Sequence, residues 1–427
     1  MVIFVSKEDV LHFLSKKYEH HVGVCYSWEN EDVHHLFLTP RKHSYGEETK
    51  VLFTSGEPCY DKIAQKMFSH VVKISGTESE PTVNVLSLFD EEWKPCDYEY
   101  IPTQKELYSR NKGLIELDIL KDKHVTIVGL GSFGSQIAIE LAKAGVGYFS
   151  LFDFDRVELH NLVRHSSLLK DLGRLKTDVI YDAIMGKNPY AKVKLFPYDI
   201  TNNNKLLDKQ IHESDIVICA TDNNQSRFII TELLEKQNKT GLFGGAITRA
   251  EGGHVFIQRP GQACYCCLIG NDFFANAREE ITNLESARRN GQIAAYVSPE
   301  DAEAMVQVGL STDIEPISNM MVKLSLVELS RGTNSGISSL EEEFVFNYYF
   351  WANRRDREYA HWASFPQCGN KPTIMRWYGT QIPKNRSCAI CSSKIVLDEG
   401  LYLPSAEIDK NELEGIEIDF ESAIVRK

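Results

Sequence analysis

A glycine-rich run between a predicted strand and a predicted helix constrains the fold of this chain most. The β-branched run His124–Val128 predicts a strand buried on both faces, and Gln136–Lys143 predicts the helix that follows it. Between them, Gly129, Gly131 and Gly134 form the pattern G-x-G-x-x-G. Glycines in this context permit a tight turn and let backbone N–H groups approach a phosphate at a helix N-terminus. The pattern serves NAD, FAD and ATP proteins alike, so it predicts a nucleotide site without specifying the nucleotide.

Strand-like and helical runs continue to alternate along the chain. Further strands are predicted at Tyr148–Phe152, Lys192–Phe196 and Ile216–Ala220, and helices at Thr177–Met185 and Ser226–Lys236. This alternation predicts an α/β fold with a doubly wound, mostly parallel, Rossmann-like sheet. Beyond a polar segment, Ile317–Arg331 predicts a long helix and Glu343–Trp351 a further strand.

The chain length of 427 residues predicts two or three domains. We expect residues 1–104 to form a separate small α/β domain of unknown role, with helices near Glu8–Tyr18 and Tyr60–Phe68. The polar run Pro95–Thr103 is expected to link it to the next unit. That unit, residues 105–393, contains the glycine pattern.

Charge and hydropathy exclude several classes of partner. With 47 basic and 60 acidic residues the formal net charge is −13, so nucleic acid and anionic lipid are disfavoured partners and any anion site must be local. Residues 394–427 form an acidic C-terminal tail, with nine acids against three bases from residue 398 onward. No apolar run approaches the roughly 18 residues of a membrane span, and Met1–Asp9 lacks a signal-peptide pattern, so we expect a cytoplasmic protein with reduced cysteines.

Charged and polar residues follow the predicted strands. They are Asp153, Asn161, Arg164, Lys176, Asp222 and Asn223. Because parallel strands end at one edge of a sheet, these residues are expected to converge beside the glycine pattern. Asp153 stands where an acid accepts hydrogen bonds from ribose hydroxyls. ATP carries about four negative charges and needs cations and Mg²⁺, so the set favours ATP over a nicotinamide dinucleotide. The alternative, that Arg164 and Lys176 are solvated surface charges, stays open.

These motifs together resemble the adenylation domain of ubiquitin-like activating enzymes and of their bacterial relatives, the ThiF- and MoeB-type adenylyltransferases of thiamine and molybdopterin synthesis. The resemblance covers residues 105–270 and continues more weakly to 391. Its motifs are Tyr108-Ser109-Arg110, the glycine pattern, Leu151–Asp155, Asn161 with Arg164, Lys176, Asn188-Pro189, Asp222-Asn223 and Gly244-Gly245-Ala246.

The resemblance implies a role for each matching residue. Asp153 would bind ribose, and Asn161 and Arg164 would contact phosphates. Lys176 would neutralise charge at the α-phosphate, and Asp222 would hold Mg²⁺. Positioned cations stabilise a charged transition state of this kind.

The resemblance also implies a reaction and partners. The C-terminal glycine carboxylate of a ubiquitin-like or sulfur-carrier protein would attack the α-phosphorus of ATP, and it needs no general base because it is already ionised. Arg110 stands where the family has an arginine that reaches the γ-phosphate in the opposite subunit, which implies a homodimer. A conjugating enzyme is a further possible partner.

Two C-x₂-C pairs predict a metal site. Cys264 with Cys267 and Cys388 with Cys391 supply four thiolates, the ligand set of a tetrahedral structural zinc site. Such a site would tie the C-terminal portion to the nucleotide domain. Redox pairs or unligated core cysteines are the alternative, and Cys266 would be a spare structural thiol.

A catalytic cysteine is less evident. Family members that pass their substrate onward have one after the first cysteine pair, but residues 268–367 contain none. Cys368, in a Pro/Gly-containing loop, is the remaining candidate for a thioester-forming nucleophile. By resemblance, 271–316 would be the crossover segment over the substrate tail.

Other functions stay open on the sequence alone. The chain could be a relative that acts on another carboxylate or on tRNA, or a non-catalytic scaffold subunit of a heterodimer. The complete set of Arg164, Lys176 and Asp222 argues against the scaffold, since an inactive subunit needs no triphosphate site.

Overall fold

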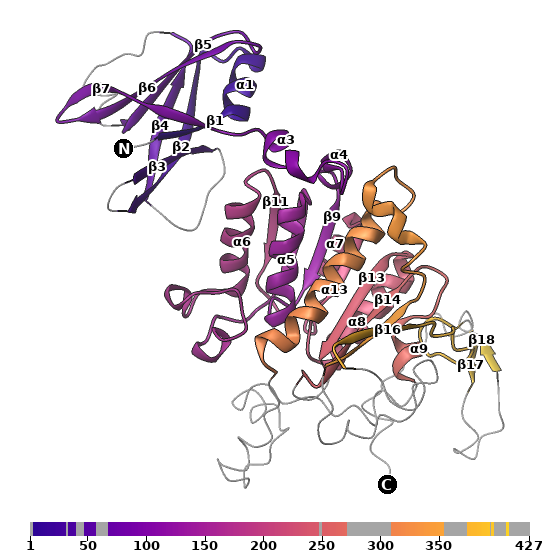
Figure 1. Cartoon of the computed structure of the whole chain (residues 1–427). Helices are drawn as coiled ribbons and strands as arrows, with labels where there is room; N and C mark the ends of the chain where they lie inside the picture. The colour runs from indigo at the N-terminus through magenta and orange to yellow at the C-terminus, as the bar shows by residue number, and fades with distance from the viewer. Residues whose placement is uncertain are drawn as a thin grey trace. The chain divides into compact units, whose positions relative to one another are not determined.

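The computed structural model describes residues 3–30, 33–39, 47–56, 67–246, 250–270, 309–353, 374–392, 394–396 and 407–409. The chain divides into two compact units (Figure 1). The first consists of residues 1–118 with 181–190, and the second of residues 119–180 with 191–427. Among the described residues no helix combines the length and apolar character that a membrane crossing requires.

The first unit is built on an eight-stranded sheet with the order β7-β6-β5-β4-β2-β3-β1-β8. The strands are β1 (Ile3–Ser6), β2 (His20–Asn30), β3 (Val33–Thr39), β4 (Glu47–Thr54), β5 (His70–Gly76), β6 (Pro81–Phe89), β7 (Glu92–Cys96) and β8 (Tyr98–Ile101). Helix α1 (Lys7–Lys16) follows β1 and buries Val10 and Phe13 against Phe53 and Val72 of the sheet. The predicted helix near Glu8–Tyr18 is thus confirmed. The second predicted helix, Tyr60–Phe68, lies mostly outside the described residues.

The predicted linker Pro95–Thr103 is wrong. Tyr98–Ile101 forms β8, which pairs in parallel with β1, so that Phe4 stands opposite Glu99. The polar residues misled the prediction, because an edge strand keeps one side accessible and needs few apolar residues. Thr103 then caps the short helix α3 (Gln104–Leu107) in a capping box with Glu106, and η1 (Ser109–Asn111) follows.

The second unit contains the predicted sheet. Its order is β11-β10-β9-β12-β13-β14-β15-β16, and its first five strands are parallel. The parallel strands are β9 (His124–Val128), β10 (Tyr148–Phe152), β11 (Lys192–Phe196), β12 (Ile216–Cys219) and β13 (Thr240–Ala246). The antiparallel strands are β14 (Gly252–Gln258), β15 (Tyr348–Ala352) and β16 (Arg376–Thr380). The doubly wound, mostly parallel α/β fold is confirmed.

Helices cover both faces of this sheet (Figure 1). They are α5 (Ser132–Ala144), α6 (Lys176–Lys187), α7 (Lys205–Glu213), α8 (Asn224–Gln237), α9 (Tyr265–Ile269) and α13 (Ser311–Ser330), with α4 (Leu117–Leu120) before β9. A Cβ at Gly241 would meet Leu234 of α8, whereas a Cβ at Gly244 would meet Met321 of α13. Residues three apart on a strand face opposite sides, so α8 and α13 pack on opposite faces. Because helices cover both faces of the sheet, a ligand would bind at the ends of its strands.

The long helix begins earlier than the sequence indicates. Helix α13 starts at Ser311, six residues before the predicted Ile317, and Pro316 lies inside it. Proline inside a helix lacks the N–H for one backbone bond, which is why the sequence favours a boundary there. Buried contacts of Ile314, Ile317 and Met321 hold the helix across this point. The strand at Glu343–Trp351 is shorter than predicted, because β15 begins at Tyr348.

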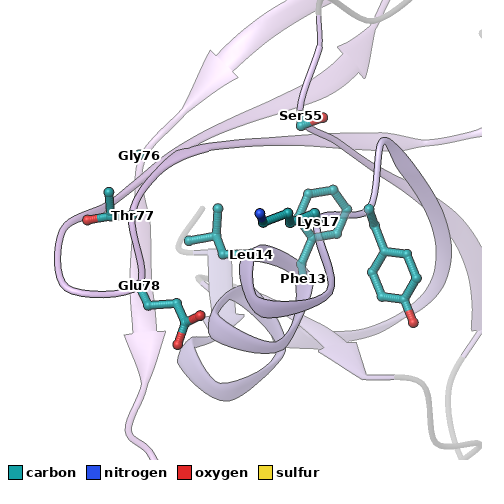
Figure 2. Close-up of a pocket in the computed structure, with 8 residues that line it drawn as sticks. Phe13, Leu14, Lys17, Ser55, Gly76, Thr77 and Glu78 are labelled. Atoms are coloured by element: carbon teal, nitrogen blue, oxygen red, sulfur yellow. The ribbon is translucent and has the colours of Figure 1, made fainter.

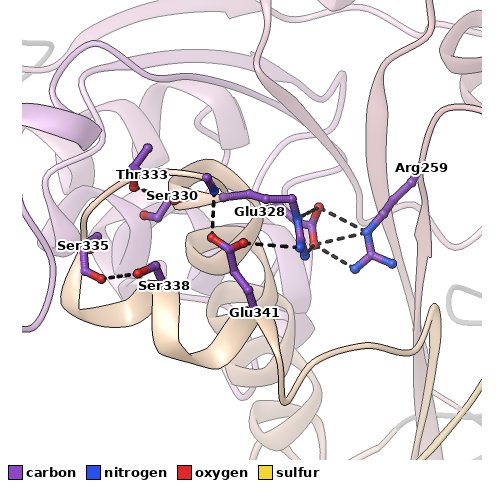
Figure 3. Close-up of polar contacts among 9 residues, drawn as sticks. Arg259, Glu328, Ser330, Thr333, Ser335, Ser338 and Glu341 are labelled. Carbon is purple, nitrogen blue, oxygen red and sulfur yellow. Dashed lines mark hydrogen bonds and ion pairs between the residues drawn. The ribbon is translucent and has the colours of Figure 1, made fainter.

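A charged cluster fastens the C-terminal end of α13 (Figure 3). The guanidinium of Arg259, just after β14, lies 2.8 Å from a carboxylate oxygen of Glu328, whose side chain is 6% exposed. Arg331 pairs with the same carboxylate, and Glu341 accepts from the N–H of Gly332. Both arginines lower the pKa of Glu328, although its burial acts in the opposite direction. The ion pair of Arg259 with Glu328 thus connects the end of β14 to α13.

Candidate functional site

The glycine turn joins β9 to α5. Gly129 has φ +88°, and a Cβ there would lie 2.7 Å from the Ala220 carbonyl oxygen. A Cβ at Gly134 would collide with the Gly129 carbonyl oxygen. Gly131, which caps α5, faces open space instead. Two glycines thus permit the turn itself, and the third leaves room in front of the helix N-terminus.

Asp153 braces this turn from β10. Its Oδ2 accepts the Leu130 N–H at 2.6 Å, and its Oδ1 accepts the Asp155 N–H at 2.8 Å. Burial raises the pKa of Asp153, while the charge of Lys176 and the two N–H donors oppose that shift. Two backbone N–H groups therefore hold the orientation of the carboxylate that is predicted to bind ribose. Each of its oxygens keeps a further lone pair that can accept a hydrogen bond from a hydroxyl.

His165 also contacts this turn, through the Leu130 carbonyl oxygen, and no motif in the sequence indicated it. Its Nε2 lies 2.7 Å from the Leu130 carbonyl oxygen, and its Nδ1 lies 2.9 Å from the Ser167 nitrogen, whose N–H it accepts. Burial is the main cause that lowers the pKa of His165, to about 4. The imidazole is therefore neutral near pH 7.

Lys176 occupies the first position of α6 and is almost fully buried. Its Nζ donates to Asp155 Oδ2 at 2.7 Å, and its backbone N–H donates to the Asp155 carbonyl oxygen. Burial lowers the pKa of Lys176, but the carboxylates of Asp153, Asp155 and Asp222 together raise it above its ordinary value. Lys176 is thus a charged ammonium facing three acids rather than a solvated surface charge.

Arg164 and Asp222 lie within electrostatic reach of each other. Burial lowers the pKa of the Arg164 guanidinium, and the negative charge of Asp222 counteracts this. The same Asp222 charge acts on Lys176. The charge of Asp222, which follows β12, therefore acts on both predicted cations.

The two predicted asparagines order the surrounding loops. Asn161 Oδ1 accepts the Glu158 N–H at 2.9 Å, and Asn223 Oδ1 accepts the Ser226 N–H at 2.8 Å as the N-cap of α8. Their amide Nδ2 groups are the parts that could contact a phosphate. Arg227, which the sequence did not indicate, donates to the Thr221 carbonyl oxygen at 2.8 Å and so holds the loop before Asp222.

Other predicted residues lie elsewhere. Arg110 belongs to η1 in the first unit and has an exposed side chain. Cys368 and residues 271–308 of the predicted crossover segment lie outside the described residues.

A cavity of about 410 Å³ in the first unit lies beside the C-terminal end of α1 (Figure 2), and none of the predicted residues lines it. Its lining includes Phe13, Leu14, Lys17, Tyr18, Thr77 and Glu78.

The four predicted metal ligands form one cluster. The sulfurs of Cys264, Cys267, Cys388 and Cys391 all lie within 4.8 Å of one another. Cys264 lies 3.5 Å from Cys388, and Cys267 lies 3.4 Å from Cys391. Zn–S bonds of about 2.3 Å in a tetrahedron place sulfurs about 3.8 Å apart, so the cluster fits zinc. The described cysteines form no disulfide.

A backbone amide lies beside the cluster. The Asn385 N–H donates to Cys267 Sγ at 3.4 Å. Buried Cys266 is outside the group of four.

The fold and the glycine turn define an α/β protein of the Rossmann-like class. A model of the ThiF family matches residues 107–354, more than half of the chain, and the chain therefore belongs to the ThiF family. The resemblance inferred from the motifs is thus confirmed.

Named relatives match part of the chain. Ubiquitin-like modifier-activating enzyme 5 of Caenorhabditis elegans is 26% identical over 181 residues, which cover 39% of this chain and 42% of the relative. Adenylyltransferase and sulfurtransferase MOCS3 of Culex quinquefasciatus is 29% identical over 214 residues, or 48% of this chain and 47% of the relative. The match thus spans less than half the length of these relatives. A crystal structure of Escherichia coli MccB with ATP is 17% identical with a TM-score of 0.46, and covers 68% of this chain and 76% of that one.

Proposed function

We propose that this chain uses Mg·ATP to adenylate the C-terminal glycine carboxylate of a ubiquitin-like or sulfur-carrier protein. The proposal is carried by two observations: the charge of Asp222 acts on both Lys176 and Arg164, and hydrogen bonds link Lys176 through Asp155 and Asp153 to Leu130 of the glycine turn. Two cations and an acid at a glycine turn suit a triphosphate with its metal better than a nicotinamide pyrophosphate. Membership in the ThiF family and relatives named as activating enzymes support the same reaction.

Each side chain has a distinct task in this proposal. The backbone N–H groups at Gly131 and the start of α5 receive phosphate oxygens, and Asp153 accepts from the ribose. Lys176 and Arg164, with Asn161 and Asn223, position the phosphates, and Asp222 ligates Mg²⁺. Mg²⁺ supplies charge neutralisation on the phosphate oxygens when it is bound.

The proposed reaction is a direct displacement. A carboxylate oxygen of the substrate forms a bond to the α-phosphorus, and the bond from that phosphorus to the bridging oxygen breaks. Pyrophosphate leaves with the electron pair, and the product is an acyl-adenylate. Lys176 lies deep enough for its charge to act strongly on the developing negative charge, because a buried ammonium is poorly screened by water.

Two further parts belong to the proposal. A zinc ion held by Cys264, Cys267, Cys388 and Cys391 would fasten residues 388–391 to the nucleotide unit. A homodimer would carry Arg110 into the partner's site. Transfer of the acyl group to the Cys368 thiolate is a separate step: a reductant-sensitive carrier adduct that is lost in Cys368→Ala would establish it, and an adduct that persists would exclude Cys368.

The test is ATP–pyrophosphate exchange with carrier proteins that end in glycine. We expect exchange with the cognate carrier, and a loss of about 10²–10³-fold for Lys176→Ala and for Asp222→Ala. Lys236→Ala is the matched control, since Lys236 is an exposed lysine in a surface pair with Asp208, and it should keep wild-type exchange. Exchange that persists undiminished in both site variants would overturn these residue roles.

A further inference from the structure

The backbone of Leu130 is held on both sides by side chains from other segments. Its N–H donates to Asp153 Oδ2 at 2.6 Å, and its carbonyl oxygen lies 2.7 Å from His165 Nε2. Its own side chain is fully buried. Both peptide groups that flank Leu130 are therefore fixed, one by Asp153 and the other by His165.

The tautomer of His165 follows from its second contact. The Ser167 N–H can only donate, so Nδ1 of His165 must accept and carries no proton. Nε2 then carries the proton and donates it to the Leu130 carbonyl oxygen. The neutral ring is retained near pH 7 because burial lowers its pKa to about 4.

The bond to the carbonyl sets the direction of the next amide. A trans peptide is planar, and its C=O and N–H point in opposite directions. Holding the Leu130 oxygen therefore aims the Gly131 N–H away from His165. Gly131 is the N-cap of α5, and nothing lies within 4 Å of a Cβ built on it, so the space beside its Cα is open at the helix N-terminus.

We propose that His165 is a positioning residue for nucleotide binding, which turns the Leu130–Gly131 peptide so that the Gly131 N–H meets a phosphate oxygen. This inference rests on the proposed function. His165 directly follows Arg164, and both residues belong to the turn that begins at Asn161, because the Arg164 and His165 N–H groups donate to the Asn161 carbonyl oxygen. One turn thus supplies a cation for the phosphates and the brace for the glycine turn.

Substitution of His165 by glutamine or by asparagine distinguishes the roles of its two ring nitrogens. In His165→Gln the side-chain amide N–H can reach the Nε2 position and keep the donor to Leu130. In His165→Asn the amide oxygen can take the place of Nδ1 and keep the acceptor for Ser167, but no donor reaches Leu130. KM for ATP and kcat are measured by pyrophosphate exchange, and the Kd of Mg·ATP by calorimetry.

We expect His165→Asn to raise KM and Kd for ATP about tenfold, the effect of one lost hydrogen bond, with kcat within about threefold of wild type. His165→Gln should stay within about threefold of wild type in all three quantities. Equal values in wild type and both variants would overturn the inference and leave the proposed function standing. A wild-type chain that binds no ATP would overturn both.

If His165→Asn does not fold, NMR spectra of the wild-type protein test the inference instead. Long-range ¹⁵N–¹H spectra should show a protonated Nε2 and an unprotonated Nδ1 for His165, and the Gly131 amide signal should shift when Mg·ATP is added. A protonated Nδ1, or a Gly131 amide that ATP leaves unchanged, would overturn the inference.

Discussion

The Nζ of Lys176 lies 2.7 Å from the Asp155 carboxylate, and the two partners differ in exposure: the lysine side chain is 9% exposed and the aspartate side chain 50%. A buried ammonium needs a negative partner, and Asp155 supplies the direct one. Phosphate oxygens of a nucleotide could take over this role. We therefore expect the pair to couple the stability of the site to nucleotide binding.

We predict that Asp155→Asn lowers the unfolding free energy of the second unit by about 1–2 kcal/mol, because Lys176 loses its direct partner while Asp155 itself is partly solvated. Mg·ATP should then raise the melting temperature of the variant by more than that of wild type, since bound phosphate replaces the lost carboxylate. Thermal denaturation with and without Mg·ATP measures this. An equal ATP-induced shift in both proteins would contradict the coupling.

Substitutions at two glycines should separate folding from binding. We expect Gly134→Ala to destabilise the chain, because its Cβ would collide with the Gly129 carbonyl oxygen. Gly131→Ala should melt within a few degrees of wild type, since its Cβ meets no protein atom, but should weaken ATP binding by occupying the space before α5. Melting curves and ATP titrations test the pair. Wild-type ATP affinity in Gly131→Ala would show that this space is not the phosphate site.

Metal analysis should find one zinc ion per chain. Cys388→Ser should lose it, because three thiolates hold zinc far less tightly than four, whereas Cys266→Ser should retain it. Chelation of wild type should lower the melting temperature. A purified chain without metal, or zinc that depends on Cys266 rather than on Cys388, would contradict the four-cysteine site.

The stability of the second unit should depend on pH through His165. Its pKa falls from 6.5 to about 4 on folding, so the unfolded state binds the proton more readily between these values. Protonation therefore favours unfolding as the pH falls below about 6.5, and at pH 5 this residue lowers the unfolding free energy by about 1.2 kcal/mol per unit of falling pH. Denaturant unfolding at pH 5–6 should give a shallower pH slope for His165→Gln than for wild type. Identical slopes would mean that the ring is protonated in the folded chain.

Much of the second sheet was predictable from local sequence. Strands β9 and β10 have the predicted bounds, because strands buried on both faces are short apolar runs between polar turns. Strand β11 also has the predicted bounds, although it lies at the edge of the sheet and leaves Lys192 and Lys194 exposed. Strand β13 carries Gly241, Gly244 and Gly245, which have no strand preference. It forms because its neighbours β12 and β14 pair with it and because α8 and α13 need small residues at their contacts.

The site was predictable to the extent that it follows strand ends. The sequence indicates Asp153, Lys176 and Asp222 as candidates in this way. Asp155 and His165 were missed, because their roles arise from hydrogen bonds to Lys176 and Leu130, 21 and 35 residues away in sequence. No sequence spacing predicts such contacts, because they depend on how the segment 153–175, between β10 and α6, packs against the glycine turn.

Direct titration of the purified chain with nucleotides tests the central claim most simply. The account predicts that Mg·ATP binds saturably at one site per chain, that Lys176→Ala and Asp222→Ala weaken this binding, and that NAD does not compete. Saturable binding of NAD together with no measurable binding of Mg·ATP would contradict it.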